Sequence, residues 1–317
     1  MIAPNQMIKA IRCNVINYKK ILTDDSCIKV IARKPRDINF FLPVRGREQF
    51  LFPILNYTNW AAKKVNSKVR ITVIENDTAP LMMDKVLSKD ADYIFIPNNL
   101  AQAKGLFAKS LCYNVGFLKT PKTVWNIFHD LDILPEPNYF VKLEKYLAKN
   151  PKWVQPYAKK RVLRLNKDYT NKICANPNNC YALGLDGTFT ESVPGSPGGS
   201  IVVRTIDFLR IGGYDPEIFY GYSPEDSFLW TKLELIYKDI KECLSTHFVG
   251  SATYADSPPI EVYHMYHETL ESSNPHYAEM TDARCSFWGY NQSDRLTVIK
   301  EKEKILNEAF SLCREDS

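Results

Sequence analysis

Short apolar runs alternate with longer amphipathic stretches over the first 130 residues of the chain. The apolar runs, rich in β-branched and aromatic residues, are 38–44, 69–74, 91–97 and 124–128. Runs of this length are typical of buried β-strands, whereas apolar residues at helical spacing predict helices over 48–66 and 100–119. Strands separated by helices indicate layers of helices around a mostly parallel sheet. We therefore predict an α/β fold.

The pattern after residue 190 predicts further strands and helices. Following a stretch rich in Gly, Pro and Ser (194–200), residues 201–203 are strand-like and 205–209 form a short helix ended by two glycines. Pro224 begins a helix that runs to about residue 237, because proline is tolerated in the first turn and acidic residues there suit the helix dipole. A closing amphipathic helix is expected over 295–313. We place an N-terminal extension at 1–37, one domain at 38–290 with an insertion at 141–195, and a C-terminal helix at 291–317.

Charge changes this picture in one segment. The 317 residues carry a net charge of +5, which is too small to indicate a nucleic-acid-binding protein. Residues 141–175 hold ten basic and two acidic residues, a net charge of +8, which leaves −3 for the remainder. This basic segment is either a contact surface for something anionic, such as an acidic glycan or a membrane surface, or a solvated surface. Neutralising Lys159, Lys160 and Arg161 distinguishes the two.

The lengths of the apolar stretches and the spacing of the cysteines indicate an intracellular protein. No stretch reaches the roughly 20 apolar residues of a membrane span, and polar residues interrupt the first 20 positions where a signal peptide would be apolar. The eight cysteines follow no metal-binding or disulfide spacing, so we expect free thiols. These features predict a cytoplasmic protein without a transmembrane segment, and they leave peripheral membrane contact open.

Two predicted strands end in charged clusters of opposite sign. Strand 38–44 leads to Arg45 and Arg47, and strand 124–128 leads to Asp130 and Asp132. The carboxyl ends of parallel strands share one edge of a sheet, where ligands bind. Arginines bind phosphate, and a pair of aspartates suits Mn²⁺ or Mg²⁺. Together they suggest a phosphate-bearing ligand bound partly through a metal, although an Asp-x-Asp pair alone is common.

Two further groups of residues carry candidate chemistry. His264 and His267 suit Mn²⁺ if a turn or a helix brings them together, and otherwise they are two unconnected histidines. Glu225 and Asp226 open the helix that begins near Pro224, where a carboxylate is held ionised. Such a carboxylate either caps the helix or acts as a general base toward a substrate hydroxyl.

Six collinear motifs between residues 38 and 268 resemble those of one enzyme family. They are PVRGR at 43–47, FAK and NVGF at 107–117, DLDILP at 130–135, GGS and FLRIGGY at 198–214, YGYSPED at 220–226, and HMYH at 264–267. In this order they resemble the β-1,4-galactosyltransferases, glycosyltransferase family 7, and the block at 220–226 is similar to that of the chondroitin-polymerase type of inverting transferase. The resemblance implies a GT-A fold, which is a single Rossmann-like nucleotide-sugar-binding domain. It also implies Mn²⁺ (or Mg²⁺), a UDP-sugar donor and inversion at the anomeric carbon.

The resemblance also assigns roles to individual residues. It implies that Asp226 is the catalytic base and that Tyr222 and Glu225 bind the acceptor. It places Asp132, His264 and His267 on the metal, with His264 standing where the vertebrate enzymes have methionine. The implied donor-binding residues are Pro43, Arg45, Arg47, Asn76, Asp77, Phe107, Lys109, Asp130, Gly198 and Gly199; at Lys109 the family has arginine.

Some positions depart from the family pattern and bear on specificity. The residues before the Glu-Asp pair are Ser223 and Pro224 instead of two glycines, which bears on the acceptor. Ser196 stands where an aromatic residue helps to select galactose, so both a hexose and an N-acetylhexosamine are candidate donor sugars. The expected acceptor is a hydroxyl of a glycan, glycolipid or glycoprotein. The family's animal members carry a membrane anchor, whereas no membrane span is predicted in this sequence, so a bacterial or viral enzyme is implied.

Two other function classes fit the same residues. A metal-dependent phosphoesterase or nucleotidyltransferase also uses acids, histidines and arginines, and it would cleave the donor at phosphorus. A non-catalytic nucleotide-sugar-binding protein would retain the fold without turnover. The sequence favours the inverting glycosyltransferase, because it contains the metal and base motifs together.

Overall fold

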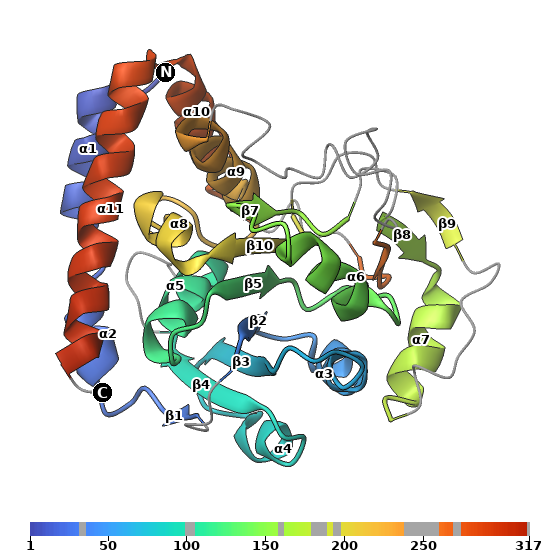
Figure 1. Cartoon of the computed structure of the whole chain (residues 1–317). Coiled ribbons are helices and arrows are strands. Elements are labelled where there is room, and N and C mark those ends of the chain that lie inside the picture. Colours follow the sequence, from blue (N-terminus) through green and yellow to red (C-terminus); the bar gives the residue numbers. More distant parts are fainter. Residues whose placement is uncertain are drawn as a thin grey trace.

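A seven-stranded mixed sheet forms the centre of the protein in the computed structural model (Figure 1). The structure describes residues 1–31, 36–98, 105–157, 162–178, 189–192, 198–237, 260–268 and 274–315. In order across the sheet the strands are β1 (Lys29–Val30), β4 (Asp92–Pro97), β3 (Val69–Asp77), β2 (Ile38–Val44), β5 (Trp125–His129), β10 (Ser200–Arg204) and β7 (Trp153–Val154).

The central four strands of this sheet, β4, β3, β2 and β5, are parallel. Strand β1 pairs antiparallel with β4, and β10 pairs antiparallel with both β5 and β7. The start of β10 therefore lies beside the end of β5, with Ser200 opposite His129. The segment that enters β10 thus lies beside the segment that leaves β5.

A smaller four-stranded sheet continues from the end of β5. Its strands, in order, are β6 (Ile133–Pro135), β11 (Val262–His264), β8 (Val162–Leu165) and β9 (Phe189–Ser192). Strand β11 pairs antiparallel with β6, which places His264 opposite Ile133. This pairing brings a segment near residue 264 next to the Asp-x-Asp segment, more than 130 positions earlier in the chain.

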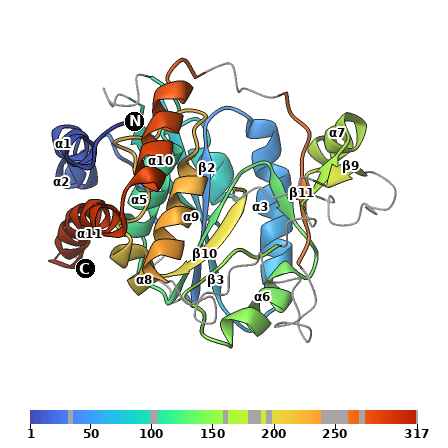
Figure 2. The same ribbon diagram turned by 90° about the horizontal axis from the view of Figure 1, so that it is seen from above.

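Helices cover both faces of the central sheet (Figure 2). On one side lie α1 (Pro4–Cys13), α2 (Tyr18–Thr23), α5 (Lys109–Lys119), α8 (Thr205–Arg210), α9 (Glu225–Ile236), α10 (Tyr277–Gly289) and α11 (Gln292–Glu315). On the other lie α3 (Glu48–Ala62), α6 (Tyr139–Leu147) and α7 (Lys167–Ala175), and α4 (Met83–Leu87) contacts β4.

The apolar strands are buried because both of their faces are covered. In β2, Phe40 and Leu42 pack into the core under α3, whereas Phe41 packs into the core under α5. Continuous apolar runs are what such two-sided burial requires. Helix α11 contributes Leu306 and Phe310 to the second of these cores.

The structure confirms the α/β prediction and shows where its details fail. Strands are found in all four early runs, and the predicted helices at 205–209, near 224–237 and at 295–313 are present as α8, α9 and α11. The helix predicted over 100–119 is wrong at its start: α5 begins only at Lys109, and Gly105 has a positive φ of 75°. The helix predicted over 48–66 ends at Ala62. The domain boundaries stay predictions.

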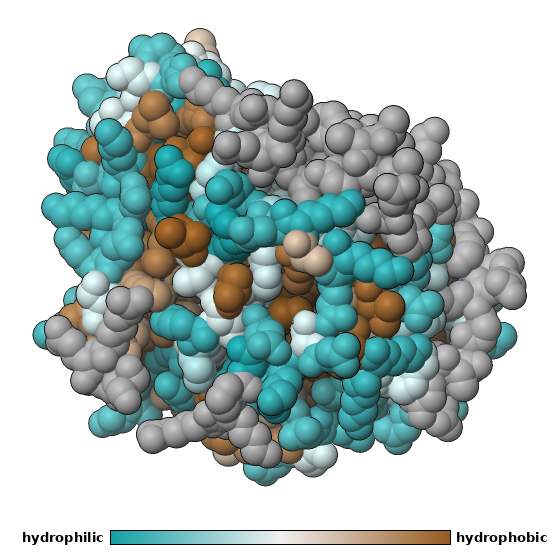
Figure 3. Space-filling view, viewed as in Figure 1, coloured by the Kyte–Doolittle hydropathy of each residue, from teal (hydrophilic) through white to brown (hydrophobic). Residues whose placement is uncertain are grey.

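The surface view shows hydrophobic residues as separate patches among hydrophilic ones on this face (Figure 3). Within the described ranges, none of the helices combines the length and the apolar character needed to cross a bilayer. In the basic segment, Lys142 forms an ion pair with Glu136 at 2.6 Å. Lys159, Lys160 and Arg161 lie outside the described residues, as does Ser196.

Candidate functional site

A cavity of about 1420 Å³ opens at the carboxyl ends of the parallel strands. The residues predicted from the sequence that line it are Pro43, Arg45, Arg47, Asp77, Phe107, Lys109, Asp130, Asp132, Gly198, Gly199, Tyr222, Glu225, Asp226, His264 and His267. The topology explains this gathering, since β2, β3 and β5 end at this edge and β10 begins there. The structure therefore brings together all but one of the predicted site residues.

The exception is Asn76, which lies behind the cavity wall. The predicted strand ended at residue 74, but β3 continues to Asp77, and this leaves Asn76 fully buried inside the sheet. Its side chain donates to the Ile96 carbonyl and accepts from the backbone N–H of Ala108, both at 3.0 Å. Asn76 thus fixes the residue that precedes Lys109, and it does not line the cavity.

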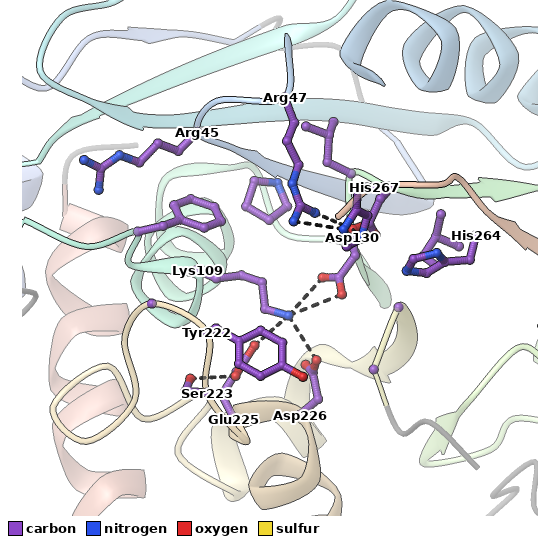
Figure 4. A pocket seen from close by; sticks show the side chains of 18 of the residues that line it. Arg45, Arg47, Lys109, Asp130, Tyr222, Ser223, Glu225, Asp226, His264 and His267 are labelled. Atoms are coloured by element: carbon purple, nitrogen blue, oxygen red, sulfur yellow. Dashed lines mark hydrogen bonds and ion pairs between the residues drawn. The ribbon is translucent and has the colours of Figure 1, made fainter. Parts of the chain in front are cut away.

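A left-handed turn directs the two arginines after β2 to different places. Gly46 and Arg47 have φ angles of 59° and 57°, a conformation that L-residues seldom adopt. Arg45 donates to the Gly105 carbonyl at 2.6 Å, whereas Arg47 points toward the Asp-x-Asp segment (Figure 4). One arginine therefore lies at the outer wall of the cavity and the other lies at its base.

Asp132, His264 and His267 form a compact cluster of potential metal ligands. One ligand atom from each residue lies within 4.8 Å of the others. The strand pairing of β6 with β11 positions His264, and the backbone N–H of Met265 donates to the Asp132 carbonyl at 2.8 Å. The chain then leaves the strand, so His267 returns to the same side, with ring centroids 5.0 Å apart. The sequence left open whether a turn or a helix would bring the two histidines together, or whether they would be unconnected.

The chemistry of this cluster fits a divalent cation. His267 Nδ1 lies 2.9 Å from the Glu268 carbonyl, an arrangement that leaves Nε2 to face Asp132, 3.0 Å away. Metal-bound histidines usually donate their second nitrogen to such a carbonyl. Burial lowers the pKa of His264 and so favours the neutral imidazole that binds metal. Two imidazoles and one carboxylate suit Mn²⁺.

Arg47 occupies a position next to this cluster. Its guanidinium donates to Asp132 Oδ2 at 2.6 Å, and its other terminal nitrogen lies 3.3 Å from His267 Nδ1. Burial alone would raise the pKa of Asp132, but His267, His264 and Arg47 together hold it below its usual range. The carboxylate is thus ionised and has a positive partner even without a metal.

Lys109 joins three carboxylates at the centre of the cavity (Figure 4). Its Nζ lies 2.6 Å from Glu225, 3.0 Å from Asp226 and 3.1 Å from Asp130. Burial lowers the pKa of Lys109, but the three carboxylates outweigh this effect and hold the pKa well above its usual value. One positive charge is therefore shared among three negative ones.

Asp226 is a carboxylate whose protonation equilibrium is strongly changed by this environment. Burial raises the pKa of Asp226 to about 7; Lys109 opposes the shift, while Glu225 and Asp130 add to it. Its side chain is 20% exposed and faces the cavity, and Tyr214 donates to its second oxygen at 3.4 Å. A carboxylate that titrates near neutral pH and is accessible to a ligand has the properties of a general base.

Glu225, the residue next to Asp226, is more buried than Asp226. It is 5% exposed, pairs with Lys109 and accepts a hydrogen bond from Ser223 at 2.7 Å. Its carboxylate therefore stabilises the start of α9 and the position of Lys109. Tyr222, also predicted to bind the acceptor, is 45% exposed at the mouth of the cavity.

Asp130 is held by groups from two elements. Tyr113, one helical turn after Lys109 on α5, donates to its carboxylate at 3.0 Å. The backbone N–H of Asp130 donates to the Gly199 carbonyl at 2.8 Å. Gly199 has a φ of 93°, and a Cβ there would lie 2.9 Å from the Tyr157 hydroxyl. This position therefore requires glycine.

Several cavity residues were not predicted from the sequence. They are Tyr157, Arg164, Asn274, Tyr277 and Arg284. Tyr113 and Tyr214, which donate to the carboxylates of Asp130 and Asp226, were not predicted as site residues either. The spacing of four residues between Lys109 and Tyr113 on one helix was a usable signal. Asn274 and the residues of α10 gave none, because nothing in the sequence relates residues 274–289 to this edge of the sheet.

Comparisons with known proteins find similarity in structure alone. No protein-family model and no curated protein matches the chain. A Drosophila β-1,4-galactosyltransferase 7 mutant, in complex with manganese, UDP-Gal and xylobiose, is 14% identical with a TM-score of 0.43, over 74% of this chain and 72% of that chain.

Two bacterial structures show a similar degree of likeness. Glucosyl-3-phosphoglycerate synthase from Mycobacterium tuberculosis, in complex with Mn²⁺, UDP and glucosyl-3-phosphoglycerate, is 11% identical with a TM-score of 0.44, over 89% and 84% of the two chains. Residues 1–349 of S. aureus TarS are 11% identical with a TM-score of 0.45, over 88% and 73%. At these values the similarity does not assign the chain to a family.

Proposed function

We propose that this chain is a metal-dependent inverting glycosyltransferase of the GT-A type, which transfers a hexose or an N-acetylhexosamine from a UDP-sugar to a hydroxyl of a glycan, glycolipid or glycoprotein. One observation carries the proposal. A single cavity holds the ligand cluster of Asp132, His264 and His267 and also contains Asp226, a carboxylate with a pKa of about 7. Transfer from a nucleotide sugar needs both a group that stabilises the leaving diphosphate and a base for the acceptor.

The donor would bind along the wall formed by the ends of β2 and β5. Asp132, His264 and His267 would hold Mn²⁺ or Mg²⁺, which supplies positive charge for the diphosphate when it is bound. Arg47 lies at the same place and has the bidentate geometry that phosphate oxygens favour. Arg45 adds positive charge at one wall of the cavity, and Lys109 adds it at the centre.

Asp226 would act on the acceptor from the opposite wall. The acceptor oxygen forms a bond to the anomeric carbon while the bond from that carbon to the diphosphate oxygen breaks. The hydroxyl proton moves to Asp226, and the electron pair of the broken bond leaves with UDP. Lys109 and Tyr214 contact the Asp226 carboxylate and orient it for this transfer. One displacement from the face opposite the diphosphate inverts the anomeric configuration.

Analysis of the products tests this proposal. The purified chain is incubated with Mn²⁺, each of UDP-glucose, UDP-galactose and their N-acetylated forms, and a panel of glycan acceptors. We expect ³¹P spectra to show UDP and proton spectra to show a glycoside whose anomeric configuration is inverted. Release of UMP with a sugar phosphate would instead identify cleavage at phosphorus, and binding of donor without products would identify a non-catalytic protein.

A further inference from the structure

Helix α10 contributes one wall of the cavity, and no role has been assigned to it so far. Tyr277 and Arg284 both line the cavity. They are seven residues apart on one helix, so they lie on the same face, separated by about 10 Å along the helix axis. An extended ligand could therefore contact both side chains at once.

An aromatic pair connects this wall to the catalytic side of the cavity. The rings of Tyr222 and Tyr277 stack with centroids 5.4 Å apart and an angle of 24° between their planes. Asn274 fixes the arrangement, because its amide donates to the carbonyls of Tyr220 and Tyr222, each at 2.8 Å. Tyr222 precedes Asp226 by four residues, so the aromatic pair has a defined position relative to the proposed base.

Arg284 differs from the other cations of the cavity in its partners. Arg47 is paired with Asp132, and Lys109 is paired with three carboxylates. Arg284 is half-buried, and in the part of the chain that the structure describes it makes no hydrogen bond or ion pair. A guanidinium in a cavity wall with its donors unused is suited to an anionic group of a ligand.

We propose that Tyr222, Tyr277 and Arg284 form an acceptor subsite for a glycan that carries an anionic group, either a carboxylate or a phosphate. The aromatic pair packs against a sugar ring near Asp226, and Arg284 binds the anionic group of a neighbouring unit. The inference rests on the proposed function, because it takes the Asp226 side of the cavity as the acceptor side. The donor diphosphate would bind on the other wall, where Arg47 and the metal-ligand cluster lie (Figure 4).

Binding measurements with matched acceptors test the subsite. The probes are a disaccharide of glucuronic acid and an N-acetylhexosamine, the same disaccharide with glucose in place of glucuronic acid, and a short polyol-phosphate oligomer. Calorimetry with Mn²⁺ and UDP present compares the wild type with Arg284→Gln, Arg284→Lys and Tyr277→Ala. Lys300→Gln serves as the control, because Lys300 is exposed on α11 and does not line the cavity.

We expect Arg284→Gln to weaken binding of an anionic probe about tenfold, the loss typical of a charge-assisted hydrogen bond, and to leave the neutral probe unchanged. Arg284→Lys should restore part of the affinity, and Tyr277→Ala should weaken all probes that bind. Preference for the glucuronate over the polyol phosphate identifies a carboxylate subsite, and the reverse preference identifies a phosphate subsite.

Two results would overturn the inference: equal effects of Arg284→Gln on neutral and anionic probes, or no effect on either. Hydrolysis of the UDP-sugar in the absence of acceptor, measured on the same variants, separates this inference from the proposed function. If the variants hydrolyse the UDP-sugar normally and Arg284→Gln binds the anionic probes as the wild type does, the subsite alone is contradicted. Absence of any UDP-sugar turnover in the wild type contradicts the proposed function.

Discussion

The ammonium of Lys109 lies 3.0 Å from the carboxylate of Asp226, and the same ammonium contacts Asp130 in the Asp-x-Asp segment. Lys109 is the first residue of α5 and Asp226 is the second residue of α9, so this contact joins the starts of the two helices. Through this contact the proposed base is linked to the segment that carries a proposed metal ligand. The protonation of Asp226 therefore depends on Lys109 as well as on burial.

The raised pKa of Asp226 predicts a pH dependence of activity. The carboxylate accepts a proton only when ionised, and its pKa is about 7, so kcat/KM should fall tenfold per pH unit below that value. The measurement is a profile of kcat/KM between pH 5 and 9 at saturating Mn²⁺. A rate that stays constant down to pH 5 would remove Asp226 as the titrating base.

Replacement of Lys109 should shift this profile. Lys109 lowers the pKa of Asp226, while Glu225 and Asp130 raise it, so Lys109→Met should move the acidic limb to higher pH. Lys109→Arg keeps the charge and should leave the limb close to that of the wild type. If Lys109→Met lowers the rate without moving the limb, the lysine does not set the ionisation of Asp226.

Arg47→Gln should change metal and donor binding in opposite directions. The guanidinium pairs with Asp132 at 2.6 Å and competes with a cation for that carboxylate. Its removal should tighten Mn²⁺ binding by roughly three- to tenfold, on the order of 1 kcal/mol, and weaken UDP binding in the presence of Mn²⁺. Titration calorimetry measures both. Arg45→Gln is the matched control, because Arg45 contacts the Gly105 carbonyl and should affect UDP alone.

Loss of one imidazole should weaken the metal site. His267 offers Nε2 beside Asp132, so His267→Ala should raise the Mn²⁺ concentration for half-maximal activity by roughly tenfold or more. Mn²⁺ should also no longer raise the melting temperature of the variant. His276→Ala is the control, since His276 lies next to Glu279 and does not line the cavity. An identical Mn²⁺ titration for His267→Ala and the wild type would contradict ligation.

Two glycines with positive φ should differ in their tolerance of a side chain. Gly46→Ala meets no atom within 4 Å, so it should cost only the left-handed backbone energy, about 1 kcal/mol. At Gly199 the new Cβ would also approach Tyr157 and Ile133, which adds roughly 1–3 kcal/mol of overpacking. Thermal unfolding of both variants measures the difference. Equal losses of stability in the two variants would show that the Gly199 loop relaxes without an energetic cost.

The sequence predicted the central sheet and much of the cavity because both depend on local signals. The apolar runs mark the parallel strands, and Arg47 and Asp132 each lie three residues beyond the end of one of these strands. Parallel strands end at the same edge, so the encounter of these residues follows from topology. Asn76 is the one predicted site residue that does not line the cavity, because the strand is longer than the apolar run.

The remaining features depend on contacts between distant segments. Glu225 and Lys109 are over 100 residues apart, and no spacing rule indicates that their side chains meet at 2.6 Å. The wall formed by Tyr277 and Arg284 depends on how α10 packs beside α9. Such tertiary contacts are set by the packing of whole helices, so they become visible only in the structure.

The most direct test of the proposed function compares Asp226→Asn with the wild type in two assays on the same preparations. Asparagine keeps the shape of the side chain but accepts no proton at neutral pH. With Mn²⁺ present, we predict that UDP-sugar binds to both proteins with similar affinity, whereas transfer to an acceptor hydroxyl falls at least about 100-fold in the variant. Transfer by Asp226→Asn at a rate close to that of the wild type would contradict the assignment of Asp226 as the catalytic base.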